Sequence, residues 1–244
     1  MEVNHVLADE KLIIALISAA VALLLGQLVV YIKYRINKCQ TKRALFKELQ
    51  DIETSLESAI AITRHKLEMN VHMIHSGTMP LPVGSYIFDN YYKEVVSELS
   101  SSQRRSYQLI HHYVKDINAS IENLTKKNIE ASEAYFLNPS SIDVKHRKLW
   151  FDRLASFYEV LCLTQWHISY HKENRRNPEL PYNGPVYDDY VAFQQDIQLA
   201  LKELIEEAKK SLQKKSRSKK HAYNKLFKRD SQRVAFSLCV GFSV

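Results

Sequence analysis

The first hydrophobic pattern in the chain is a continuous apolar run. Residues 12–32 read LIIALISAAVALLLGQLVVYI and contain no charged side chain. At a rise of about 1.5 Å per residue, a helix over this run is about 31 Å long, which matches the hydrocarbon core of a bilayer. The run is longer than the core of a signal peptide, follows an acidic N-terminus and leads into Lys33 and Arg35 without a small-residue cleavage site. It predicts an uncleaved transmembrane helix, preceded by a short extracytoplasmic segment at residues 1–11.

Beyond residue 44, apolar residues recur every three or four positions, which is typical of amphipathic helices. The first such seam follows the apolar run and a basic juxtamembrane segment at 33–47, so we expect one helix to continue through all three. The seam, interrupted by two polar residues, consists of Leu45, Leu49, Ile52, Leu56, Ala59, Thr63, Leu67, Asn70 and Ile74. A later helix of the same chain is the favoured partner of this seam, and a second copy of the chain is the alternative.

Four further helices are expected, separated by breaks that contain proline at 76–84, 138–141 and 177–185. A short aromatic helix at about 85–99 is expected to bury one side, made of Tyr86, Ile87, Tyr91, Val95 and Leu99. The next helix follows the serines at 100–102 and runs to about 135, with the seam Tyr107, Ile110, Val114, Ile117, Ile121 and Leu124. A helix at about 142–172 has the seam Trp150, Leu154, Phe157, Leu161, Thr164 and Ile168.

The last expected helix begins near Asp188 and Asp189, since acidic side chains suit the positive end of a helix dipole. Its apolar face is Tyr190, Phe193, Ile197, Leu201, Leu204, Ala208 and Leu212. Four long helices and one short helix, joined by short connections, fold most economically as an antiparallel bundle. The sequence therefore predicts an all-α protein, with one N-terminal transmembrane helix and a cytoplasmic bundle over residues 48–212.

Two segments follow the predicted bundle. Residues 213–233 form a basic tail with interleaved aromatic residues, and residues 234–244 alternate apolar and small residues as a half-buried strand does. The alternating segment suits addition to the edge of a partner's sheet, docking on its own bundle, or a poorly ordered end.

The distribution of charge predicts the orientation of the chain. The net charge is +7, and residues 33–47 hold six Lys and Arg residues and no acid. Basic residues stay on the cytoplasmic side of a membrane, so we expect the N-terminus outside and residues 33–244 in the cytoplasm, at the inner (plasma) membrane. Ten basic residues are expected to contact the anionic inner leaflet: Lys33, Arg35, Lys38, Lys42, Arg43, Lys214, Lys215, Arg217, Lys219 and Lys220. For the basic tail, a merely solubilising or disordered segment is the first alternative, and nucleic-acid binding is a less favoured one.

Composition excludes several classes of enzyme. The chain has five glycines, and no Gly-rich phosphate loop, dinucleotide fingerprint or nucleophile elbow occurs in it. Its three cysteines are far apart, which fits a reducing compartment and does not suit a disulfide framework or a zinc ribbon. We expect no cofactor.

Two groups of residues are candidates for a specific role. Ser18, Ala22 and Gly26 lie four apart on one face of the transmembrane helix, where small residues let two helices approach closely. His72 and His75, and His167 and His171, are spaced to share a helix face and are weak candidates for metal ligands. The simpler expectation places these histidines at the surface or at helix ends, and the carboxylates of residues 48–208 on solvated faces.

The hypothesis that fits these features is a single-pass, membrane-anchored helical protein that acts by binding, as a scaffold, sensor or regulator at the inner membrane face. A protein partner or self-association is expected, and no catalysis. Two alternatives stay open. One is a membrane-acting effector, of the toxin or exclusion type, that oligomerises through the transmembrane helix. The other is a metal-dependent enzyme in which the two histidine pairs converge.

Overall fold

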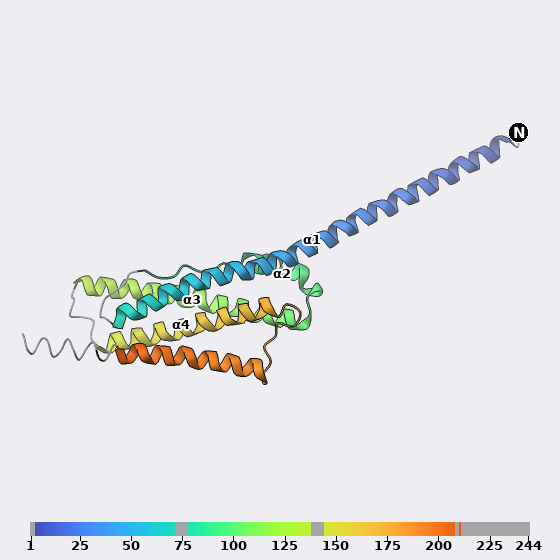
Figure 1. Ribbon diagram of the computed structural model, residues 1–244. Helices are drawn as coiled ribbons and strands as arrows, with labels where there is room; N and C mark the ends of the chain where they lie inside the picture. Colours follow the sequence, from blue (N-terminus) through green and yellow to red (C-terminus); the bar gives the residue numbers. More distant parts are fainter. Residues whose placement is uncertain (1–2, 72–77, 138–143, 208–209, 211–244) are drawn as a thin grey trace, which may run out of the picture.

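The computed structural model describes residues 3–71, 78–137, 144–207 and 210, and these residues contain helices and no strands (Figure 1). The prediction of an all-α chain is confirmed. The long helices are α1 (Val3–Val71), α3 (Ser101–Leu137), α4 (Val144–Glu173) and a helix over residues 185–207, drawn in orange without a label. The short helix α2 (Tyr86–Val95) is extended by a 3₁₀ turn, η1 (Val96–Glu98).

Helix α1 is unbroken from the apolar run into the packed helices, as predicted. Residues 15–37 are exposed along their whole length and extend away from the other helices (Figure 1). This part of α1 is long and apolar enough to cross a membrane, and none of its apolar stretch is buried against the rest of the structure.

The predicted seams form one hydrophobic core. On α1, every seam residue from Leu45 to Leu67 is at most 2% exposed, and this seam packs chiefly against α4. A later helix of the same chain is therefore the partner of the first seam, as expected. The α3 seam is buried throughout, and on α4 only Trp150 is partly exposed. Ile74, Ala208 and Leu212 lie outside the described residues.

The predicted inner side of the short helix is partly wrong. Val95 and Leu99 are buried, but Tyr86 and Tyr91 are exposed and contact each other edge to face, with ring centroids 6.1 Å apart. Phe88 and Tyr92 pack on the core instead, together with Ile87. Aromatic residues occur on several sides of α2, so the helical repeat allows two choices of buried face. Packing against α1 buries the face that contains Phe88 and Tyr92.

Local signals set the ends of the helices. Ser100 Oγ accepts a hydrogen bond from the Gln103 amide, and the Gln103 side chain accepts one from the Ser100 amide, which is a reciprocal capping box at the start of α3. The last helix begins at residue 185 rather than near Asp188, so that prediction was three residues late. Pro185 has no amide hydrogen to leave unpaired in a first turn, and Gly184 at φ 90° turns the chain into it.

Candidate functional site

Basic residues of α1 contact the end of the short helix where α1 joins the other helices. The bundle consists of the packed residues 38–71, 78–137 and 144–207. Lys38 Nζ donates to Ser97 Oγ at 3.3 Å, and Lys42 Nζ donates to the Glu98 carbonyl oxygen at 3.1 Å. Arg35 and Lys38 also lie 3.6 and 3.5 Å from the Glu98 carboxylate. Cations at a helix C-terminus are favourable because the last carbonyls carry partial negative charge. Three of the basic residues expected at the membrane surface therefore contact the η1 turn.

The opposite end of α2 is held by a buried carboxylate. Glu48 on α1 is 6% exposed and accepts hydrogen bonds from the Ile87 and Phe88 amides at 2.6 and 3.0 Å. These amides belong to the first turn of α2, where no helical carbonyl is available to them. Burial raises the pKa of Glu48, and the two amides act against that shift. The expectation that carboxylates occupy solvated faces is wrong for Glu48.

His111 completes this buried cluster. Its ring stacks on Phe88 with centroids 3.7 Å apart, and its Nε2 atom lies 3.8 Å from Glu48 Oε2. His111 is 1% exposed, and neither ring nitrogen has a hydrogen-bond partner among the described residues. Burial lowers the pKa of His111 to about 4. The imidazole is therefore neutral near pH 7, although a carboxylate is close.

The two described members of the histidine pairs also lie in the core. His171 Nδ1 is 2.7 Å from Ser106 Oγ, and its ring meets Tyr107 edge to face. His167 lies between the rings of Tyr113 and Tyr190, at 5.7 and 5.3 Å. Burial lowers the pKa of both histidines to about 4. The expectation of surface histidines is wrong for this pair, because α3 and the last helix cover this face of α4. His171 does lie in the last turn of α4, as the helix-terminal expectation has it.

The described residues contain no group of three or more His, Cys, Asp or Glu side chains that would hold a metal ion. His72 and His75 lie outside the described residues, so the convergence of the two pairs stays a prediction. The same holds for the basic tail, including Lys214, Lys215, Arg217, Lys219 and Lys220, and for the alternating segment. Ser18, Ala22 and Gly26 are exposed on α1. Apart from its chain neighbours and the nearby backbone of α1, no described atom lies within 4 Å of a Cβ placed on Gly26.

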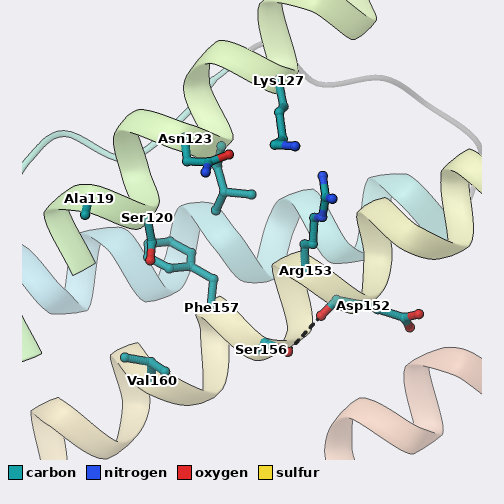
Figure 2. Close-up of a pocket in the computed structure, with 10 residues that line it drawn as sticks. Ala119, Ser120, Asn123, Lys127, Asp152, Arg153, Ser156, Phe157 and Val160 are labelled. Atoms are coloured by element: carbon teal, nitrogen blue, oxygen red, sulfur yellow. Dashed lines mark hydrogen bonds between the residues drawn. The ribbon is translucent and has the colours of Figure 1, made fainter. Parts of the chain in front are cut away.

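A groove of about 630 Å³ opens between α3 and α4 (Figure 2). Leu124 and Phe157 form its apolar floor, and both are buried. The small side chains Ala119, Ser120 and Ser156 leave the space between the two helices unfilled. The remaining lining residues are Asn123, Lys127, Asp152, Arg153 and Val160.

Two cations face each other across the mouth of this groove. Figure 2 shows the side chains of Lys127 from α3 and Arg153 from α4 pointing toward one another, while the Asp152 carboxylate points away from them. Within the described ranges, neither cation has an ion-pair partner. An apolar floor below two unpaired cations suits a ligand that is apolar on one side and anionic at its edge.

Sequence reasoning did not identify Glu48, His111 or the groove. One local signal existed for Glu48. It directly precedes the seam residue Leu49, so it lies at the edge of the apolar face of α1. No comparable signal marks Lys127 or Arg153, because their proximity depends on how α3 and α4 pack.

Comparisons with protein-family models, with curated proteins and with solved structures find no match.

Proposed function

We propose that this protein is anchored in the inner (plasma) membrane by residues 12–32, with its N-terminus outside, and that its cytoplasmic bundle acts by binding a protein partner. The observation that carries the proposal is the continuity of α1. One helix exposes an apolar surface over residues 15–32 and supplies the core seam from Leu45 to Leu67. A helix without a break transmits position and orientation, so it would present the bundle at a fixed height above the bilayer.

The contacts around η1 support this proposal. Lys38 and Lys42 lie 6 and 10 residues beyond Ile32, which is about 9 and 15 Å along the helix. The contacts to Glu98 and Ser97 therefore brace α1 just above the expected membrane surface. Lys33 and Arg43 are exposed there and remain available to the anionic leaflet.

The predicted orientation is testable at Cys39, which is exposed and lies seven residues beyond Ile32. In a Cys239→Ser background, a membrane-impermeant maleimide is expected to label Cys39 in inside-out vesicles and not in intact cells. Cys162 is buried and should stay unlabelled in the folded protein. The matched control is Asn4→Cys combined with Cys39→Ser, which should reverse the result. Labelling of Cys39 in intact cells would contradict the proposed orientation.

In-cell crosslinking with mass spectrometry tests the binding role. We expect intermolecular crosslinks from the bundle to a protein at the membrane. Leu24→Arg with Leu25→Arg should abolish these crosslinks, because each arginine at the centre of a span costs about 2.5–3.5 kcal/mol of insertion free energy. Leu24→Ile with Leu25→Ile is the matched control and should retain them. If the wild-type chain crosslinks neither to a partner nor to itself, the proposal is wrong.

A further inference from the structure

We infer that the groove between α3 and α4 is the docking site for an acidic amphipathic helix of a partner protein. The inference rests on the proposed function, since it gives the binding role a surface and a partner chemistry. It is carried by the shape of the groove, by its charge and by its distance from the membrane.

The shape suits the side chains of a helix. Each wall extends over eight residue steps, 119–127 on α3 and 152–160 on α4, which is about 12 Å or two helical turns. A docked helix places residues i, i+3 or i+4, and i+7 along that length. The floor of Leu124 and Phe157 is apolar, and Val160 continues it at one end. An apolar stripe on the partner helix would fill this space.

The charge of the walls selects among such helices. Lys127 and Arg153 point toward each other from opposite walls, so both present positive charge to the groove (Figure 2). A glutamate or aspartate beside the apolar stripe of a docked helix would lie between them. Arginine can also bind a carboxylate through two parallel hydrogen bonds. Basic and neutral helices gain nothing from these two side chains.

Distance from the bilayer argues against a lipid as the occupant. Tyr158, near one end of the α4 wall segment, lies beside Arg64 on α1. Arg64 is 32 residues beyond Ile32, or about 48 Å along α1. The headgroup layer extends only about 5–8 Å beyond the hydrocarbon core. A helix tilt of 40° would still leave the groove far from the lipids.

Charge also argues against the chain's own basic tail. Residues 213–233 hold nine Lys and Arg residues and a single acid, Asp230. Placing this segment in the groove would bring further cations against Lys127 and Arg153. The acidic helix is therefore expected from another protein.

The first test measures binding of two designed peptides to the full chain in nanodiscs by fluorescence anisotropy. Each peptide is an amphipathic helix of about 16 residues with leucines at i, i+4 and i+7, flanked in one peptide by glutamates and in the other by lysines. We expect the wild-type chain to bind the glutamate peptide at least about tenfold more tightly. Lys127→Glu with Arg153→Glu should reverse this preference.

The matched control is Lys126→Glu with Lys148→Glu. It makes the same change in net charge on the same two helices, at exposed residues that do not line the groove. This variant should keep the wild-type preference. Equal affinity of the two peptides for the wild-type chain, or an equal loss of preference in both double variants, would overturn the inference.

The second test places a photo-crosslinking amino acid at Ser156 in the groove, or at the exposed Gln50 on α1, in living cells. Crosslinks from position 156 to an acidic segment of another protein, lost with Lys127→Glu and Arg153→Glu, would support the inference. Crosslinks to lipid, to residues 211–244 or to a second copy of the chain would overturn it. No crosslink at position 156, with partners captured from elsewhere on the bundle, would overturn this inference and leave the proposed function standing.

Discussion

Lowering the pH from 7.5 to 5 is expected to remove most of the stability of the bundle. Burial holds the pKa of His111, His167 and His171 at about 4, whereas a histidine in the unfolded chain titrates near 6.5. Below pH 6.5 the unfolded chain therefore binds more protons than the folded chain, so the free energy of unfolding falls with pH. At pH 5 each histidine contributes a loss of about 2 kcal/mol. Three together lose about 6 kcal/mol, which is comparable to the whole stability of many domains.

Glu48 acts in the opposite direction. Burial raises the pKa of its carboxyl group, so the folded chain takes up this proton more readily than the unfolded chain as the pH falls. One carboxyl group opposes three imidazoles, and the net result is still a loss of stability. Urea unfolding of the full chain in detergent, followed by the fluorescence of the two tryptophans, both on α4, measures the effect.

Variants at single histidines test the origin of the pH effect. His167→Phe keeps an aromatic ring between Tyr113 and Tyr190 and removes one titrating group, so it should lower the loss between pH 7.5 and 5 by about a third. His65→Asn, at an exposed position on α1, is the control and should leave the loss unchanged. Stability that is flat between pH 7 and 5 would show that the three imidazoles are not held neutral.

Replacing Glu48 by alanine is expected to cost about 2–3 kcal/mol of unfolding free energy and to loosen α2. The change leaves the partly buried amides of Ile87 and Phe88 without their acceptor. Part of this cost is offset, because the variant no longer buries a carboxylate. Glu48→Gln keeps one acceptor oxygen but turns an amide group toward the second donor, so an intermediate loss is expected. Urea unfolding gives the free energy, and hydrogen exchange at the two amides reports the local change.

The matched control for Glu48 is Asp51→Ala on the same helix. Asp51 is exposed, lies three residues further along α1 and caps no helix, so its removal should change the stability by less than about 0.5 kcal/mol. Faster exchange at Ile87 and Phe88 should occur in Glu48→Ala and not in Asp51→Ala. Equal stability of the two variants would mean that solvent replaces the buried carboxylate without cost.

The helices were predictable because their signals are local. The seam residues from Leu45 to Leu67 are spaced by four or three positions, so they lie on one side of any helix that contains them. Their side chains are buried in the structure. Asn118 shows where local reasoning stops. Its side chain pairs with both the amide and the carbonyl of Val83, at 2.7 and 2.8 Å, and so holds a non-helical segment 35 residues away. Nothing in the spacing around Asn118 indicates this contact.

An all-α chain, the continuous helix α1 and the residues of its core seam could all be predicted, because hydrophobic periodicity is a property of each helix alone. Which polar residues lose contact with water depends on how the helices pack. Glu48 is buried because α2 covers it, although Ile87 is 39 residues further along the chain. Lys127 and Arg153 face one groove because α3 and α4 form its opposite walls. Burial and charge pairing depend on what packs across from a residue, and sequence periodicity does not contain that information.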